Sequence, residues 1–409
     1  MTSSGAKTTK TTPLLFTPKK IRELTIRNRI IASPMCQYLS HDGGPNDWHM
    51  MHLGRLAIGG CGIVFGEETA VEPNGRKTHA CAGLYKNSHV AAYRTLTDMI
   101  KKHGATPAIQ LGHSGRKGSC HGAMEDWRPL DETDAANGLP PWQVMTPTAE
   151  ISPPRPIPHK EMDQADINQV INDFRTATKL SIDAGYEIAE IHGAHGYLIH
   201  QFLSSTSNQR QDSYGGSLEN RMRFAIEVAS AVRDLWPKQH PVFFRLSAVD
   251  SQGGSWTLNE AVALAKALRD VGIDMIDVSS GGISGLSNMP MVPRIPAYQA
   301  SFSGRIRRQA NVGTIAVGGI TEAQQAEDIL QSGDSDMIAM ARELMWNSDW
   351  PAHAAYVLGL DDPFSYLPDG YAHRLRQREE QKKMKINQDK ALIEKSLRYF
   401  MDDEAPLPK

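Results

Sequence analysis

Short apolar runs rich in β-branched residues alternate with longer helical patterns through most of this chain. A short and continuously apolar run is typical of a parallel strand that is buried on both faces. Eight strand-and-helix units in succession predict a single (β/α)8 barrel, the α/β fold known as the TIM barrel. The predicted strands are residues 30–33, 62–65, 107–111, 187–191, 242–246, 275–278, 314–317 and 337–340.

Helices are predicted between these strands, because several segments carry apolar residues at the i, i+3, i+4 spacing of one helix face. Thr257 and Thr321 precede two of these segments, at the position where an N-cap is expected. The predicted helices are residues 89–103, 164–184, 218–235, 258–271 and 322–331.

Two additions to the minimal barrel are expected before residue 162. Residues 15–18 and 24–29 predict two short strands around a polar turn, a hairpin that would plug the bottom of the barrel. Residues 118–161 form a long, proline-rich loop after the third strand, with Trp127 and Trp142. A loop of this length is either a lid or ligand wall, or an ordered surface excursion packed by its own aromatic residues.

We divide the chain into a barrel, residues 13–360, and a C-terminal extension, residues 361–409. From His373 onward, charged residues of both signs surround scattered apolar positions. This pattern predicts an amphipathic helix that caps the barrel or a neighbouring subunit, and solvated disorder is the alternative. The apolar positions are Met384, Ile386, Leu392, Ile393 and Leu397.

The charge balance gives no argument for a nucleic-acid or membrane partner, so a small-molecule substrate is expected. Lys and Arg total 44 against 46 Asp and Glu, a formal net charge of −2 over 409 residues. The four cysteines form no C-x-x-C pair that would indicate a zinc knuckle or iron–sulfur cluster. Residues 1–15 lack the apolar core of a secretory signal, and no run approaches the length of a membrane span. We therefore expect a cytoplasmic protein.

The clearest signal for a functional site follows the fourth strand, where His192, His195 and Tyr197 come directly after an apolar run. Two neutral imidazoles can both donate hydrogen bonds to one anionic oxygen, and a nearby phenol can supply a proton. A lone histidine at a strand end more often caps backbone carbonyls. The three side chains together predict a catalytic site that polarises and then protonates a substrate.

A phosphate site is predicted at the last two strands. Gly318 and Gly319 would offer bare backbone amides before a helix, and Arg342 follows the eighth strand. No G-x-G-x-x-G or Walker A sequence occurs between a predicted strand and a helix, so a Rossmann or P-loop interpretation has no support.

Five ordered motifs stand near the predicted strand ends: Ser33-Pro34-Met35-Cys36-Gln37-Tyr38, Gln110-Leu111-Gly112-His113-Ser114-Gly115-Arg116-Lys117, His192-Gly193-Ala194-His195-Gly196-Tyr197, Asp212-Ser213-Tyr214-Gly215-Gly216-Ser217 and Ala341-Arg342-Glu343-Leu344. Together they resemble the old yellow enzyme family, and Cys36 followed by Tyr38 resembles its bacterial YqjM-like branch. The resemblance spans residues 13–350. It implies a homodimer or homotetramer that binds FMN without a covalent bond. It also implies reduction of activated C=C bonds with NADPH or NADH, by ping-pong hydride transfer through FMN, in unsaturated aldehydes, ketones, imides and nitroalkenes.

The resemblance also implies roles for individual residues. His192 and His195 would bind the substrate oxygen, Tyr197 would donate the proton, and Tyr38 would be a second phenol in contact with substrate. No metal is implied. The FMN-binding residues would be Ser33, Pro34, Met35, Cys36, Glu68, Gln110, His192, Arg245, Gly281, Gly282, Gly318, Gly319, Ala341 and Arg342.

Three features depart from the family pattern. Glu68 stands where the family commonly has a small residue near the flavin, and its carboxylate would lower the flavin potential or turn outward. Ala341 stands where many members have Gly. The branch often inserts a C-terminal arginine into the neighbouring site, for which Arg374 and Arg376 are both candidates.

Two other functions are open on the residues alone. His113, His192 and His195 all follow predicted strands and would be ligands in a metal-dependent barrel hydrolase. Cys36 would be the oxidisable thiol of a non-catalytic flavin redox sensor. The hydrolase is disfavoured because Arg245 replaces a carboxylate at a strand end, and the sensor because it needs no proton donor.

Overall fold

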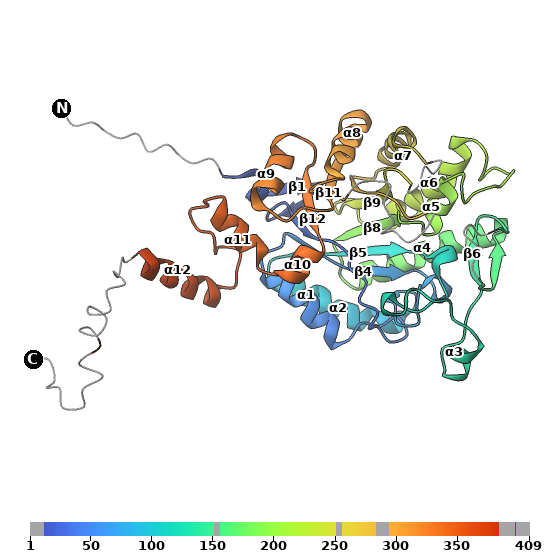
Figure 1. Ribbon diagram of the computed structural model, residues 1–409, viewed down its shortest axis with the longest axis horizontal. Helices are drawn as coiled ribbons and strands as arrows, with labels where there is room; N and C mark the ends of the chain where they lie inside the picture. Colours follow the sequence, from blue (N-terminus) through green and yellow to red (C-terminus); the bar gives the residue numbers. More distant parts are fainter. Residues whose placement is uncertain (1–11, 151–155, 251–255, 284–293, 384–396, 398–409) are drawn as a thin grey trace, which may run out of the picture.

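A closed parallel barrel forms the centre of the protein. The computed structural model describes residues 12–150, 156–250, 256–283, 294–383 and Leu397. Within these residues, eight parallel strands pair in the order β3, β4, β5, β8, β9, β10, β11 and β12, and β12 pairs with β3 to close the ring. Figure 1 shows the strands in the middle of the molecule with helices around them. The predicted (β/α)8 barrel is confirmed.

Each predicted barrel strand is present. The largest difference is in β4, which was expected to end at residue 65 and continues to Ala70. The strands are β3 (Ile30–Ala32), β4 (Ile63–Ala70), β5 (Thr106–Gly112), β8 (Ile188–Gly193), β9 (Val242–Ser247), β10 (Met275–Ser279), β11 (Gly313–Val317) and β12 (Met337–Met340).

The five predicted helices are also present, and further helices lie between and after them. The predicted ones are α2 (Asn87–Lys102), α4 (Gln164–Asp183), α6 (Leu218–Leu235), α7 (Leu258–Asp270) and α9 (Ala323–Gln331). The others are α1 (Asp47–Ile58), α3 (Glu132–Ala136), α5 (Leu198–Leu203), α8 (Ala300–Ala310), α10 (Arg342–Trp346), α11 (Trp350–Val357) and α12 (Asp369–Lys383), with 3-10 turns η1 (Leu14–Phe16), η2 (Pro73–Gly75), η3 (Gly115–Lys117) and η4 (Ala123–Glu125).

One of the two predicted N-caps is correct. The Thr257 side chain accepts a hydrogen bond from the backbone of Glu260, whose carboxylate accepts from the Thr257 amide in return. The prediction for Thr321 is wrong, because α9 begins after Glu322, which makes no side-chain cap bond. The Thr321 amide instead donates to the side chain of Gln325 at 3.1 Å.

The lower half of the barrel interior is apolar. Alternate side chains of the strands point inward and form one cluster, and Ile21 and Ile26 of the N-terminal hairpin pack with it. This confirms the predicted plug. The inward residues are Ile31, Ile63, Phe65, Ala108, Ile188, Phe243, Met275, Ile315, Val317, Met337 and Ala339.

The hairpin begins later than the sequence suggested. Its antiparallel strands are β1 (Lys19–Ile21) and β2 (Leu24–Ile26), whereas the predicted strand at residues 15–18 is wrong and is replaced in part by η1. The backbone N–H groups of Leu14 and Leu15 donate to the carboxylate of Glu327, at 2.8 and 2.9 Å. These amides are therefore satisfied without a strand partner.

A β-bulge in β4 decides which way two glutamates point. Phe65 pairs with Ala108, but Glu68 pairs with Gln110, so one extra residue is inserted on β4. Cross-strand partners point to the same face of a sheet. Glu68 therefore points into the barrel beside Gln110, and Glu67 points outward and pairs with His49 of α1 at 2.9 Å.

The long loop after β5 is described over residues 118–150 and 156–161, and it contacts residues outside the loop. It contains α3 and a parallel pair of strands, β6 (Val144–Thr146) and β7 (His159–Glu161). The Trp127 ring packs edge-on against Tyr38 with centroids 5.5 Å apart, and Trp142 packs against His79. Because both tryptophans contact residues outside the loop, the structure favours a ligand wall over a self-packed excursion.

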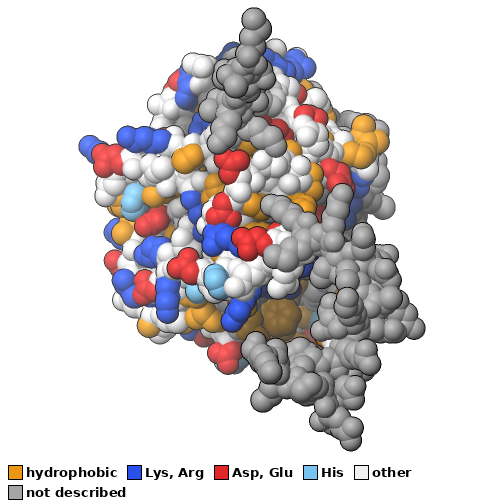
Figure 2. Space-filling view, turned by 90° about the vertical axis from the view of Figure 1, so that its left-hand side faces the viewer, with side chains coloured by type: hydrophobic (Ala, Val, Ile, Leu, Met, Phe, Trp, Pro, Cys, Tyr) orange, Lys and Arg blue, Asp and Glu red, His pale blue; other side chains and the backbone are white. Residues whose placement is uncertain are grey.

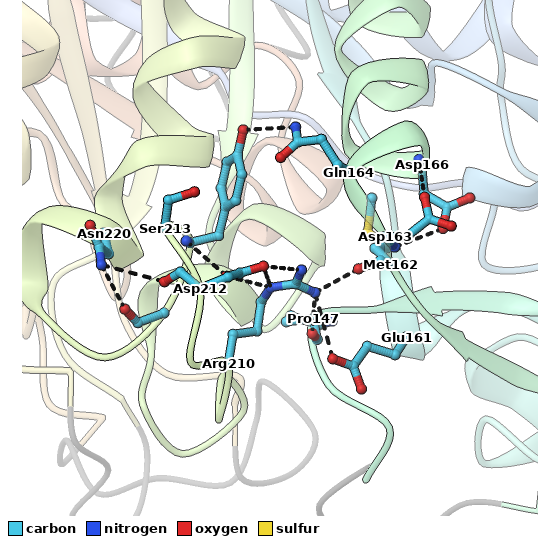
Figure 3. A network of polar contacts seen from close by, with 12 residues as sticks. Pro147, Glu161, Met162, Asp163, Gln164, Asp166, Arg210, Asp212, Ser213 and Asn220 are labelled. Carbon is cyan, nitrogen blue, oxygen red and sulfur yellow. Dashed lines mark hydrogen bonds and ion pairs between the residues drawn. The ribbon is translucent and has the colours of Figure 1, made fainter.

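Arg210 fixes the base of this loop (Figure 3). Its guanidinium donates to the carbonyl oxygens of Pro147 and Met162, at 2.8 and 2.6 Å, and pairs with Asp212. Tyr214, from the same motif, hydrogen-bonds Gln164 and Glu227. Asp212 and Tyr214 of this motif therefore order the surrounding loops.

In the C-terminal extension, residues 361–368 form turns and α12 follows them. α12 packs through Ala372 and Leu375 on a small cluster that includes Phe364 and Leu367. Arg376 pairs with Asp362 at 2.6 Å within the chain. The predicted apolar positions from Met384 to Ile393 lie outside the described residues, and the division at residue 360 stays a prediction. Among the described residues, no helix is both long and apolar enough to cross a membrane.

Candidate active site

The upper half of the barrel interior is polar, in contrast to its lower half. Above the apolar cluster, the inward-pointing side chains are Gln110, Glu190, Arg245 and Asp277, and all four are buried. His192 follows on the same inner face, since its register partner is Arg245. The predicted residues of β5, β8 and β9 are thus brought together at the carboxyl ends of the strands.

His192 and His195 lie in direct contact. The Nε2 atom of His192 is 3.2 Å from Nδ1 of His195, and Nε2 of His195 is 2.6 Å from the Ser279 hydroxyl. The Ala194 amide donates to Nδ1 of His192 at 3.1 Å, which leaves the proton of a neutral ring on Nε2. His192 is therefore held as an Nε2–H donor.

Both histidines are neutral at ordinary pH. Burial lowers the pKa of His192 well below its usual value, and the neighbouring charges of His195 and Arg245 lower that pKa further. Burial likewise lowers the pKa of His195, with Arg245 and Lys117 adding to the effect. A neutral imidazole can stabilise a developing negative charge by hydrogen bonding without giving up its proton.

Tyr197 completes the predicted group of three. Its ring centroid is 4.7 Å from that of His192. Burial raises the pKa of the Tyr197 phenol, and the ammonium group of Lys77 opposes that shift. The phenol is therefore protonated at neutral pH, as a proton donor must be.

The loop that carries His195 and Tyr197 is fixed by a buried pair that the sequence analysis missed. His200 and Asp250 form an ion pair at 2.9 Å with both side chains fully buried. The Gly196 amide donates to Nδ1 of His200 at 3.0 Å. His200 stands only three residues after Tyr197, so its closeness to the motif was a usable signal. Nothing in the sequence connected Asp250 to it.

Arg245 is surrounded by buried carboxylates. It pairs with Asp277 at 3.4 Å and donates to the Ser33 hydroxyl at 3.3 Å. Gln110 donates to Glu190 at 2.7 Å. Burial raises the pKa of Glu190, and the neighbouring Asp277 raises it further. The sequence analysis missed Asp277, although an aspartate inside an apolar strand needs a cation in a folded protein.

The predicted strand-one residues follow the end of β3. Pro34, Met35 and Cys36 are partly buried, and Tyr38 has a left-handed backbone with φ of 56°. Burial raises the pKa of the Cys36 thiol to about 12, an effect that Lys77 only partly offsets. The thiol is therefore not a reactive thiolate at neutral pH, which counts against a redox sensor based on Cys36.

Glu68 does not reach solvent. It is 2% exposed and forms an ion pair with Lys77, which is 1% exposed. Of the two alternatives for Glu68, the outward-turned carboxylate is wrong, because the bulge in β4 directs the side chain into the barrel. The sequence analysis missed Lys77, since it stands in a polar turn with no periodic signal. The need of a buried carboxylate for a cation was the one available clue.

The paired glycines occupy backbone positions that other residues rarely adopt. Gly282 has φ of 114°, and a Cβ there would lie 2.2 Å from the His195 backbone, so this glycine makes room for the histidine loop. Gly318 and Gly319 have φ of 104° and 67°. The side chain of Arg342, at the start of α10, makes no hydrogen bond or ion pair with another described residue.

His113 belongs to a different contact. Its Nε2 atom is 2.8 Å from Glu72, and its Nδ1 atom accepts from the Gly115 amide at 3.0 Å. In the part of the chain that the structure describes, no group of three His, Cys, Asp or Glu side chains has the arrangement of a metal site.

Taken together, a closed β/α barrel with proton donors and a buried arginine at the carboxyl ends of its strands defines a barrel enzyme. Residues 14–361 match the model of the NADH:flavin oxidoreductase / NADH oxidase family. An NADPH dehydrogenase of Geobacillus sp. (strain WCH70) is 41% identical over 349 residues, which is 85% of this chain and 95% of that protein. The NADPH dehydrogenase of Bacillus subtilis (strain 168) is 36% identical over 351 residues, 85% of this chain and 96% of that protein.

Solved structures of similar proteins have the same fold. Morphinone reductase has a TM-score of 0.69 and 25% identity, covering 88% of this chain and 95% of that one. An old yellow enzyme homologue from Zymomonas mobilis has a TM-score of 0.69 and 22% identity, covering 88% and 99%, a likeness that supports the fold alone. This chain belongs to the NADH:flavin oxidoreductase family, the old yellow enzymes, in its YqjM-like branch. It is an NAD(P)H-dependent flavin oxidoreductase with FMN as cofactor.

The residues at the strand ends fit a flavin. Among the described residues the Arg245 guanidinium donates from Nη1 to the Ser33 hydroxyl, and its Nε atom faces Asp277 at 3.4 Å, so its other Nη donors can bond a flavin. Backbone amides at Gly318 and Gly319, together with the guanidinium of Arg342, which no other described residue pairs with, are the groups that a phosphate requires.

Proposed function

We propose that the protein is an ene-reductase that reduces the activated C=C bonds of unsaturated aldehydes, ketones, imides and nitroalkenes. Bound FMN supplies hydride transfer from NADPH or NADH to these acceptors, which would use the site in turn in a ping-pong cycle. The observation that carries this proposal is the gathering of His192, His195 and Tyr197, with ring centroids 5.0 and 4.7 Å apart.

In this proposal, residues from several strand ends hold the cofactor. Arg245 and Gln110 would hydrogen-bond the isoalloxazine, and a fixed cation would favour its reduced, anionic form. Gly318, Gly319 and Arg342 would bind the phosphate. The remaining contacts would come from Ser33, Pro34, Met35, Cys36, Glu68, His192, Gly281, Gly282 and Ala341.

His192 and His195 would bind the oxygen of the substrate carbonyl or nitro group. The Ala194 amide holds Nδ1 of His192, and its Nε2–H faces Nδ1 of His195; substrate binding would replace that acceptor with the ligand oxygen. Negative charge appears on the substrate oxygen only as hydride reaches the β-carbon. Two neutral donors aimed at that oxygen therefore stabilise the transition state more than the ground state.

Tyr197 would then protonate the α-carbon, and Tyr38 would contact the substrate from the side of the long loop. Both phenols are protonated at neutral pH, because burial raises the pKa of each. The Trp127 ring against Tyr38 holds that phenol from the solvent side.

An anaerobic visible spectrum of the purified holoenzyme tests the proposed function. NADPH should bleach the flavin absorbance, and cyclohexenone should then restore it without oxygen. A flavin that bleaches but recovers only with oxygen would overturn the ene-reductase proposal.

Phenol binding tests the proposed oxygen site separately. Phenolate ligands of the oxidised enzyme should give a long-wavelength charge-transfer band, and His192→Ala with His195→Ala should abolish it. A band that persists in the double variant would place the oxygen site elsewhere.

We also propose that the protein is a homodimer or homotetramer. Large apolar side chains are exposed on neighbouring helices, with Trp346 of α10 at 88%, Val357 of α11 at 68% and Met51 of α1 at 63%. Exposed apolar side chains of this size are typical of subunit contacts. On the face shown in Figure 2, acidic and basic side chains are interspersed rather than gathered by sign. Light scattering of wild type and Trp346→Glu tests this, and a monomeric wild type would overturn it.

We propose a cytoplasmic location as well. All four cysteines, Cys36, Cys61, Cys81 and Cys120, are free thiols. Unpaired thiols are typical of a reducing compartment. Fractionation of the native host cells tests this proposal, and recovery in the secreted fraction would overturn it.

A further inference from the structure

The catalytic scheme above gives no role to Lys77, which forms an ion pair with Glu68. Lys77 follows η2, and Glu68 is on β4 beyond the bulge. The ammonium group contacts Oε2 of Glu68, and Oε1 has no hydrogen-bond partner among the described residues. At Gly112 a Cβ would lie 2.4 Å from this Oε1 atom, so β5 leaves space for the carboxylate.

Stability alone does not account for such a pair. Removing two charges from water is costly, and their attraction often only offsets that cost. A pair of well-packed apolar side chains of the same size would fold as well or better. A pair with one carboxylate oxygen still unsatisfied is therefore better explained by its effect on neighbouring groups.

The neighbours of this pair are the two phenols of the proposed site. The Lys77 ammonium lies 5.2 Å from the centroid of the Tyr197 ring and 5.9 Å from that of Tyr38. Lys117 lies 5.7 Å from the same Tyr197 ring and also donates to the His195 carbonyl at 2.6 Å. Two ammonium groups thus lie near the Tyr197 ring, of which that of Lys77 is the more deeply buried.

We propose that Lys77, kept charged by Glu68, is a positioning residue that sets the acidity of Tyr197. This inference rests on the proposed function. When Tyr197 protonates the substrate, its O–H bond breaks and a C–H bond forms from the enolate electron pair. The phenolate that remains carries one negative charge, which the nearby ammonium stabilises until water returns a proton. Without Glu68, burial would favour the neutral amine form of Lys77, which could not stabilise the phenolate.

The expected size of the effect follows from the distance. At the effective permittivity of a protein interior, a unit charge 5.2 Å away changes the acidity of the phenol by about two orders of magnitude. If about half of the phenolate charge has developed in the transition state, removing Lys77 slows protonation about tenfold.

The experiment compares two acceptors in single-turnover oxidation of the reduced holoenzyme. Cyclohexenone needs a proton from the enzyme, whereas a nitroalkene forms a nitronate that is stable enough to be protonated in water. Lys77→Met should slow the cyclohexenone reaction about tenfold and leave the nitroalkene reaction unchanged. Lys77→Arg should restore most of the rate.

Two further variants keep the test decisive. Lys77→Met with Glu68→Leu replaces the whole pair by apolar residues, so it folds even where a lone buried Glu68 would not. Lys86→Met removes an exposed lysine paired with Asp42 and should change neither reaction. In a Tyr197→Phe background, removal of Lys77 should cause no further loss.

Three results would overturn the inference: an unchanged cyclohexenone rate without Lys77, an equal loss with both acceptors, or a further loss in the Tyr197→Phe background. Failure of the proposed function looks different, because wild type itself would then not be reoxidised by cyclohexenone.

Discussion

Acid should destabilise the folded protein through its buried histidine pair. His192 and His195 have ordinary pKa values of 6.5, and burial lowers both well below that in the folded state. Above pH 6.5 neither the folded nor the unfolded state binds a proton at these rings. Below pH 6.5 the unfolded chain does and the folded chain does not, so the free energy of unfolding falls as the pH falls.

The size of the effect follows from linkage. Each histidine that stays neutral in the folded state lowers the free energy of unfolding of the protein by about 2 kcal/mol between pH 8 and pH 5. The pair therefore lowers it by about 4 kcal/mol. The two rings are 3.2 Å apart, and protonation of one opposes protonation of the other. Both contributions should therefore be present over this range.

Urea denaturation of the holoenzyme at pH 8 and pH 5 measures the effect. The His192→Asn, His195→Asn double variant should lose about 4 kcal/mol less than wild type between the two pH values. His373→Asn, on the exposed side of α12, should behave as wild type. If the double variant loses as much as wild type, the histidines are not held neutral, and their proposed role as neutral donors fails with that result.

Three other predictions test how the structure supports the site. Thr257→Ala should lower the free energy of unfolding by about 1 kcal/mol, and Thr321→Ala should change it by less than about 0.5 kcal/mol. The reason is that only the Thr257 side chain caps a helix. Equal losses in urea denaturation would contradict the assigned caps. Arg210→Ala should raise hydrogen exchange in β6 and β7, because it removes bonds to the carbonyl groups of the residues that directly follow the two strands. Arg128→Ala, in an exposed part of the same loop, should leave their exchange unchanged. Cys36 should react slowly with iodoacetamide at pH 8, because its pKa is raised to about 12; peptide mapping that finds it labelled as fast as a free thiol would contradict that protonation state.

The strands and much of the site were predictable, because both depend on local patterns. Buried parallel strands are continuous apolar runs, and all eight could be read from the sequence. The carboxyl ends of such strands meet at one end of the barrel, so His192, Gln110 and Arg245 were expected to converge before any contact was known.

Other contacts were not predictable, because they depend on a single inserted residue or on distant partners. The bulge in β4 shifts the alternation by one position, and without it Glu67 rather than Glu68 would face the barrel. Lys77 belongs to a turn that would ordinarily be solvated. Leu14 and Leu15 lack a strand partner only because Glu327, more than 300 residues away, accepts their hydrogen bonds.

The division of the barrel into an apolar lower half and a polar upper half explains how the site can hold neutral histidines beside several charges. Ile21 and Ile26 close the lower end against water, so the charges above are weakly screened. In such surroundings Asp277 and Glu68 balance the charges of Arg245 and Lys77, whereas His192 and His195 have no carboxylate in contact and stay neutral. The placement of the carboxylates, which the bulge in β4 and the register of β10 determine, therefore selects which groups act as charges and which act as hydrogen-bond donors.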